Sequence, residues 1–158
     1  RRQRQMCIRD SPRTTLAKQL AEYVLLYSPW QMAADMIENY EHQPAFSFVE
    51  SVPTDWEKTV VVNAKIGNYI TIARKDKASD DWYVGSATDV DARDLSIDLS
   101  FLDKDREYMA EVYADGPGAD FRSNPYPLMY QRIRVTYASS LRLHLAPSGG
   151  AAIRIKAF

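Results

Sequence analysis

The sequence has little of what several classes of site require. Its 158 residues include one cysteine and two histidines, so an internal disulfide and a Cys/His metal cluster are both excluded. No apolar run approaches the ~18 residues of a membrane-spanning helix. The 20 Lys and Arg residues are matched by 21 Asp and Glu residues, so net charge gives no reason to bind nucleic acid. The hydrophobic content of 46% is that of an ordinary globular protein.

The near-neutral net charge hides a basic segment at residues 1–13. It carries five arginines against one aspartate. It has no apolar periodicity, no aromatic residue and no long apolar core of a signal peptide. We interpret it as a non-native or disordered leader; the alternative is a basic arm for nucleic acid or an anionic surface.

Residues 14–55 predict two short helices. Apolar residues recur at helical spacing at Leu16, Leu20, Val24 and Tyr27. Pro29 ends this first helix, and a second is expected between Pro44 and Val52. Both present a broad apolar surface, for which we expect no partner within the chain. These residues are therefore interpreted as the tail of a larger α/β domain, and the chain as a fragment.

After residue 55 the hydrophobic period changes from 3.6 to 2. Leu95, Ile97, Leu99 and Phe101 alternate with polar residues in the clearest half-buried strand. Val60, Val62, Ala64 and Ile66 alternate in the same way, and six further segments bring the total to about eight strands. One apolar and one polar face per strand favour antiparallel sheets packed face to face. The fold class is therefore mainly β: an antiparallel β-sandwich over residues 56–158, preceded by a helical remnant.

Few residues are candidates for chemistry. The acidic loop at residues 89–94 invites a calcium interpretation, but Asp94 stands where a helix–loop–helix calcium site needs glycine. A solvated turn is favoured, and no metal site is predicted. His42 and His144 each lack a neighbouring ligand. No catalytic residue is predicted, because no nucleophile elbow or phosphate loop is present.

Aromatic residues offer a second kind of site. Trp82 and Tyr83 are adjacent in a predicted strand, so one should point away from the core. Tyr126 and Tyr130 flank the end of a long loop. Exposed aromatic rings on a β-sandwich stack on sugars or anchor a protein interface. We therefore name Trp82, Tyr126 and Tyr130 as candidate carbohydrate-binding residues, with ordinary packing as the alternative.

Several cations take outward positions on the last strands and would form a basic stripe if those strands were neighbours: Arg132, Arg134, Arg142, Arg154 and Lys156. We expect a solvated face balanced by acids, and no nucleic acid partner.

Two segments, SPWQMAAD and VPTDW, are specific enough to identify a family. Together with YMAEVYADGPGAD, the SNPY turn and LAPSGGAAIRI, they resemble the C-terminal part of glycoside hydrolase family 97. Its members are exo-acting α-glucosidases and α-galactosidases. The resemblance covers Thr14 to about Ile155. Trp30 stands where a smaller apolar residue is expected.

The resemblance implies a parent enzyme with an N-terminal β-domain, a (β/α)8 catalytic barrel and a C-terminal β-sandwich. Residues 14–55 would be the end of the barrel, and residues 56–158 the sandwich that braces it and supports oligomerisation. The partners implied are the missing domains, a second copy of the chain and the parent's oligosaccharide substrate. Periplasmic or secreted placement is also implied. Glucoside and galactoside specificity both stay open.

The family's catalytic glutamates and calcium-binding glutamates lie upstream of Thr14, so none can be placed on this sequence. Calcium is implied for the parent enzyme only, and the chain alone is expected to be inactive. Asp35 follows the apolar stretch that would be the last barrel strand, and the C-terminal ends of barrel strands face the active site. It is therefore a barrel-rim candidate, with a helix N-cap as the alternative.

Overall fold

The computed structural model of the chain describes residues 13–32 and 43–158. Two short helices precede eight strands: α2 (Leu16–Leu25) and α4 (Phe46–Ser51). The strands are β1 (Trp56–Lys65), β2 (Tyr69–Asp76), β3 (Trp82–Thr88), β4 (Arg93–Asp98), β5 (Tyr108–Asp115), β6 (Leu128–Val135), β7 (Ser140–Leu145) and β8 (Gly150–Ala157). The predicted leader at residues 1–12, Asp35 and His42 lie outside the described residues.

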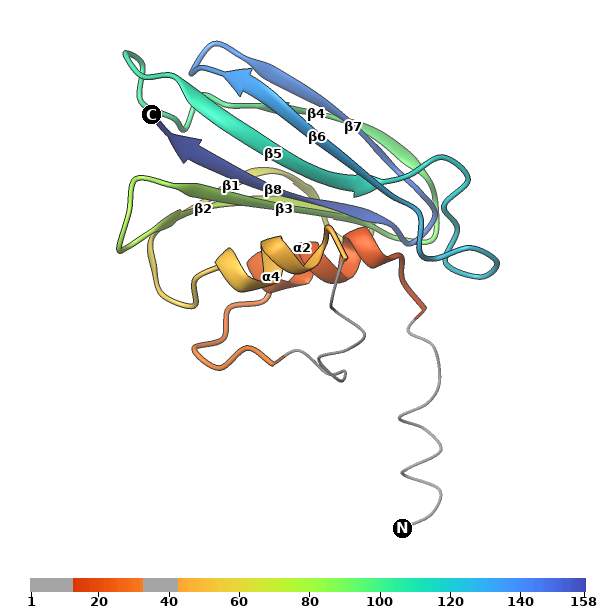
Figure 1. The fold of residues 1–158 in the computed structure, drawn as a ribbon. Helices are drawn as coiled ribbons and strands as arrows, with labels where there is room; N and C mark the ends of the chain where they lie inside the picture. Colours follow the sequence, from red (N-terminus) through yellow and green to blue (C-terminus); the bar gives the residue numbers. More distant parts are fainter. Residues whose placement is uncertain (1–12, 33–42) are drawn as a thin grey trace.

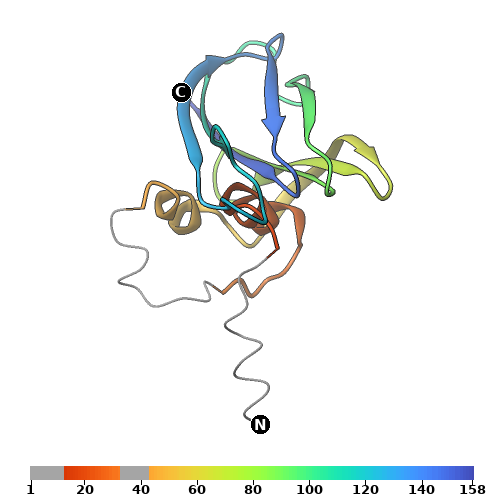
Figure 2. The same ribbon diagram turned by 90° about the vertical axis from the view of Figure 1, so that its right-hand side faces the viewer.

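The strands form two antiparallel sheets, which confirms the predicted mainly β fold. Six strands make a large sheet in the order β1-β2-β3-β8-β5-β6, and β4 pairs with β7 in a small one. Figures 1 and 2 show the small sheet on one side of the large sheet and both helices on the other. The molecule therefore has three layers, with the large sheet in the middle.

The core between the two sheets is built from the alternating apolar residues that the sequence pattern identified. Ile97 and Leu99 of the small-sheet side are fully buried, as are Ile153 and Ile155 of β8. Burying a side chain of this size contributes about 1.5–3 kcal/mol. This core holds the sandwich together.

A second apolar core lies on the other face of the large sheet, under the helices. Leu20 and Val24 of α2 and Phe48 of α4 pack there with Tyr83 and Tyr113. The expectation that the helices lack a partner within the chain is therefore wrong for the buried face of α2. The Thr15 hydroxyl caps the start of this helix by accepting a hydrogen bond from the Lys18 amide at 3.3 Å.

The two cores also correct the interpretation of Trp82 and Tyr83. Neither side chain points to solvent: Trp82 lies between the sheets at 4% exposure, and Tyr83 lies under the helices at 2%. Side chains on a strand alternate between faces, and here both faces of β3 are covered.

The alternation predicted for β1 breaks at Val62. The pairing of β1 with β2 shifts between Val61 and Asn63, as a β-bulge requires. As a result Asn63 turns toward the small sheet, where its Nδ2 donates to the Ser96 carbonyl at 3.1 Å. Ile66, predicted to be apolar and inward, is fully exposed.

Candidate functional site

The helical layer is seated on the large sheet at two glycines. A Cβ atom at Gly85 would lie 2.7 Å from the Ala21 carbonyl oxygen of α2, and one at Gly150 would lie 2.7 Å from the Lys18 Cα. Real Cβ atoms do not approach so closely. The helix backbone therefore rests directly on β3 and β8, and the absence of side chains there sets the distance between the layers.

Aromatic rings extend this contact toward α4. Phe48 meets Tyr83 and Tyr113 edge-on, with ring centroids 6.0 and 5.5 Å away. The Tyr83 hydroxyl donates to the Ser51 carbonyl at 2.7 Å, and burial raises the pKa of Tyr83 to about 12. The helical layer and the large sheet are thus joined both by packing and by a hydrogen bond.

Arg74 fixes the far end of α2. Its guanidinium lies 5.6 Å from the ring of Tyr27 and 5.8 Å from that of Trp56, and its Nη2 donates to the Leu25 carbonyl at 3.4 Å. No ion pair among the described residues includes Arg74, although it is only 7% exposed. Burial lowers its pKa. The Leu25 carbonyl at the C-terminal end of the helix and the two aromatic faces stabilise this cation instead.

Asp115 closes the other end of the contact. Its buried Oδ2 accepts hydrogen bonds from the amides of Ala146 and Gly150, at 2.8 and 2.9 Å. Burial raises the pKa of this carboxyl group, although the two amides and the nearby Thr15 hydroxyl favour its charged form. Asp115 therefore holds the turn between β7 and β8 beside the start of α2.

The acidic loop at residues 89–94 is held in place by hydrogen bonds to Asp89. Asp89 accepts a hydrogen bond from the Asp91 amide at 3.0 Å, and its two carboxylate oxygens accept from Nη2 of Arg93 at 3.0 and 2.9 Å. The Asn68 side chain also donates to it, at 3.1 Å. These donors lower the pKa of Asp89 to about 2. Arg93 thus occupies the position that a cation would take.

Among the described residues, no group of three or more His, Cys, Asp or Glu side chains could hold a metal ion. These residues therefore do not fit the calcium ion that the resemblance implies for the parent enzyme.

Replacing Asp89 with asparagine is expected to destabilise the chain above about pH 4. The folded pKa lies below the usual 3.8, so the stability that Asp89 contributes is complete above that value and is lost as pH falls toward about 2. The difference in melting temperature between wild type and D89N should therefore shrink on acidification. Asp91→Asn is the matched control, since the Asp91 side chain is 75% exposed and 3.7 Å from Arg93. An equal, pH-independent loss in both variants would contradict this assignment.

The three candidate carbohydrate-binding residues do not form one platform. Trp82 is buried between the sheets, so a sugar cannot stack on it. Tyr126 is 71% exposed in the loop before β6, and Tyr130 is 44% exposed on the helix side of β6, 5.0 Å from the Tyr113 ring. Only these two remain available to a ligand.

The predicted basic stripe is divided by acids and by the fold. Glu111 lies between two of these cations: its Oε1 is 3.5 Å from Nε of Arg132, and its Oε2 is 3.2 Å from Nζ of Lys156. Arg154 pairs with Asp81 at 3.0 Å, and Arg142 lies in the other sheet. His144 is on the surface as expected, 2.7 Å from Asp94.

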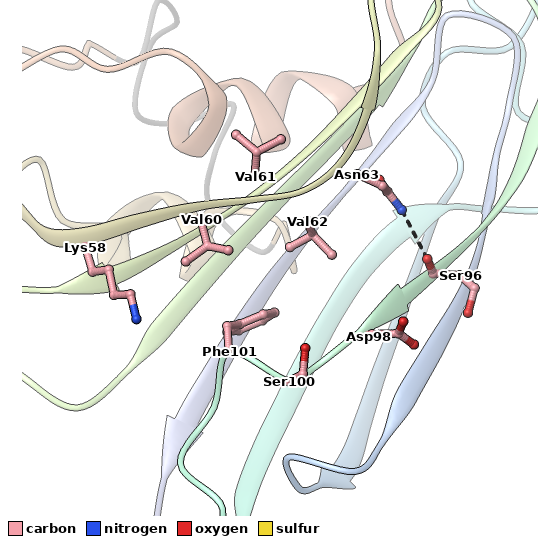
Figure 3. Close-up of a pocket in the computed structure, with 9 residues that line it drawn as sticks. All are labelled: Lys58, Val60, Val61, Val62, Asn63, Ser96, Asp98, Ser100 and Phe101. Carbon is pink, nitrogen blue, oxygen red and sulfur yellow. Dashed lines mark hydrogen bonds between the residues drawn. The ribbon is translucent and has the colours of Figure 1, made fainter.

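An open groove of about 410 Å³ lies where β1 and β4 leave a gap between the sheets (Figure 3). Its apolar floor is formed by Val60, Val62 and Phe101, and Phe101 packs on Trp82 with ring centroids 4.9 Å apart. Asp98 is the only carboxylate among its lining residues. Glycoside hydrolysis requires two carboxyl groups. With one carboxylate in its lining, the groove lacks this pair.

Hydropathy patterns do not single out the residues that join the helices to the large sheet: Gly85, Gly150, Arg74 and Asp115. One signal was available. The central strands are rich in glycine and alanine on the face turned toward α2, and small residues in a strand mark close approach of another backbone.

The chain is similar in sequence to known proteins. The sequence pattern of a family described as "Glycosyl-hydrolase 97 C-terminal, oligomerisation" matches residues 55–156. A retaining alpha-galactosidase of Bacteroides thetaiotaomicron is 38% identical over 148 residues, which are 90% of this chain and 21% of that protein.

The chain is also similar to parts of solved structures. A glycoside hydrolase family 97 enzyme from Pseudoalteromonas sp. strain K8, in complex with acarbose, is 48% identical with a TM-score of 0.89, over 93% of this chain and 23% of that one. A beta-arabinopyranosidase is 26% identical with a TM-score of 0.72, over 90% of this chain and 21% of that one. The chain thus spans about a fifth of the length of the relatives it matches.

Proposed function

Because this chain belongs to the glycosyl-hydrolase 97 C-terminal oligomerisation family, we propose that it braces the catalytic barrel of a family 97 α-glycosidase and joins its subunits. Hydrolysis of terminal α-glucosides or α-galactosides would be the activity of the whole enzyme. The chain itself would contribute no catalytic carboxylate. The observation that carries the proposal is the direct seating of α2 on Gly85 and Gly150.

The outer surface of the helical layer supports the bracing role. Past the end of α2, Leu26, Tyr27 and Trp30 are 63%, 62% and 78% exposed. A cluster of large apolar side chains at one place on a surface is typical of a contact with another protein surface. Tyr27 lies against the Arg74 guanidinium, which ties this segment to the sheet. A barrel packed here would therefore be linked rigidly to the sandwich.

Neither described helix has the length or the apolar run that a membrane crossing requires. Periplasmic or secreted placement and the parent's calcium ion stay proposals supported by the resemblance alone. Cell fractionation and metal analysis of the full-length enzyme would test them.

Size-exclusion chromatography with light scattering tests the assembly role on the whole chain. We expect a stable oligomer whose mass does not change when a malto-oligosaccharide is added. Hydrolysis of nitrophenyl α-glucoside and α-galactoside by the chain should not exceed the buffer rate. A monomer at every concentration would contradict subunit joining, and measurable hydrolysis would contradict the non-catalytic assignment.

A carbohydrate-binding module is the second candidate, favoured by the exposure of Tyr126 and Tyr130. It predicts that the chain is retarded by immobilised polysaccharide or shifts its elution on adding sugar, and that Tyr126→Ala abolishes the shift. Binding without assembly would select this function over the first.

A further inference from the structure

The free edge of β6 is the feature from which a subunit contact can be located; the inference rests on the proposed assembly function. β6 is the last strand of the large sheet. It pairs with β5 on one side over eight consecutive residues, from Leu128 to Val135, with no shift of register. The N–H and C=O groups on its other side have no strand partner within the described sheets.

The opposite edge of the same sheet is protected in ways that β6 is not. β1 has two register shifts along its pairing with β2. Lys58 of β1 lines the groove between the two sheets, so this edge also carries an inward charge. Bulges and inward charges are the means by which edge strands avoid pairing with another chain. β6 has no bulge and no proline, and the strands of the small sheet are only six residues long. Of the described strands, β6 is thus the long, regular edge open to pairing.

The side chains at this edge are only half covered. Met129 and Ile133 lie on the face of β6 that looks toward the small sheet, yet they are 36% and 37% exposed. On the same face Val135 is buried. β7 packs over β5 and β8, so the small sheet ends before it covers the middle of β6. A second sheet that continued this edge would cover both residues.

We propose that two copies of the chain join along β6, antiparallel and edge to edge, with the two-fold axis at Gln131. The six-stranded sheets of both copies would become one continuous sheet. In this register Met129 lies opposite Ile133 of the second copy, Tyr130 lies opposite Arg132, and Leu128 lies opposite Arg134.

The register follows from charge and from proline. Directly opposite residues of antiparallel strands lie on the same face, so a symmetric pairing is centred on one residue. A centre at Arg132 would place two arginines opposite each other, and a centre at Ile133 would place Arg132 opposite Arg134; like charges directly opposite are destabilising. A centre at Tyr130 would bring Pro127, which has no N–H, opposite Ile133. The centre at Gln131 avoids both like-charge pairs, moves Pro127 to the end of the paired segment opposite Val135, and places Arg132 over the Tyr130 ring of the second copy.

Disulfide cross-linking tests the register. In a chain with Cys7 replaced by serine, Gln131→Cys places the two sulfur atoms at the axis, where opposite Cα atoms are about 4.5–5.5 Å apart and within disulfide range. We expect most of the protein to migrate as a dimer after mild oxidation and as a monomer after reduction. Arg134→Cys is the matched control on the same strand, because the two residues 134 would be roughly 20 Å apart at ~3.4 Å per residue. Equal cross-linking of both variants, or of neither, would overturn the proposed register.

Charge substitution at the half-covered pair tests the contact without a covalent trap. Met129→Glu should raise the dimer dissociation constant at least about tenfold, since it buries an unpaired carboxylate. Adding Ile133→Lys in the same chain should restore the dimer, because the introduced carboxylate then lies opposite the introduced ammonium group of the second copy. Far-ultraviolet circular dichroism checks that each variant is folded. If a charge variant does not fold, the cross-linking of Gln131→Cys alone decides whether the β6 contact exists. An oligomeric wild type that Met129→Glu leaves intact would overturn the β6 contact but not the assembly function; a monomeric wild type would overturn both.

Discussion

Replacing Gly85 with alanine is expected to lower the free energy of unfolding by about 2 kcal/mol, because small-to-large changes at tightly packed sites typically cost about 1–3 kcal/mol. The added methyl group would meet the Ala21 carbonyl at 2.7 Å and the side chains of Val24 and Leu25 at 3.1 Å. A backbone oxygen cannot rotate away, so α2 must lift from the sheet.

The melting temperature should fall by roughly 4–8 °C. Limited proteolysis should cut residues 13–32 before it cuts the sandwich, since the added methyl group points toward Ala21, Val24 and Leu25 of α2. Ser96→Thr is the control: it also adds one methyl group to a strand, but at an exposed position where the hydroxyl is kept. Equal stability of G85A and wild type would mean that α2 is not seated as described.

Asp115→Ala should produce the second large effect, a loss of about 2–5 kcal/mol, since it leaves the buried amides of Ala146 and Gly150 without an acceptor. Asp115→Asn retains one oxygen at this place and should recover part of the loss. Urea unfolding of the three proteins measures both differences.

The comparison with Asp115→Asn also has a defined pH dependence. The folded pKa of Asp115 is raised above its usual 3.8. Its contribution to stability is therefore complete below that value and declines as pH rises through the folded pKa. The advantage of wild type over D115N should be larger near pH 3.5, roughly, than near pH 7. An advantage that grows with pH would show that the carboxyl group is stabilised in its charged form.

The strands were predictable because one physical pattern, alternate burial, governs most of them. β7 shows it cleanly: Leu141, Leu143 and Leu145 are buried, and the residues between them are exposed. The pattern failed where the backbone departed from regular pairing, at the bulge between Val61 and Asn63. A bulge changes which residues face inward without changing the composition of the strand.

The pattern also failed at the central strands, where every residue of β3 is buried. Alternation carries no information when both faces are covered. The residues that make the second core possible are small, and glycine has no side chain whose polarity could signal a face. For the same reason the contact between α2 and the sheet could not be derived from hydropathy: it depends on the missing Cβ of Gly85 and on carbonyl positions that only the folded backbone defines.

Only four residues, 52–55, separate the end of α4 from the start of β1, and they are not a tether. Val52 and Trp56 both pack into the core beneath the helices, so this connection has no segment free to swing. Under the proposed function, a barrel joined to the helical layer would have a fixed orientation relative to the sandwich. Two such barrels joined through β6 would then face directions set by the twist of one sheet, and the spacing of their active sites would be a property of the dimer rather than of thermal motion.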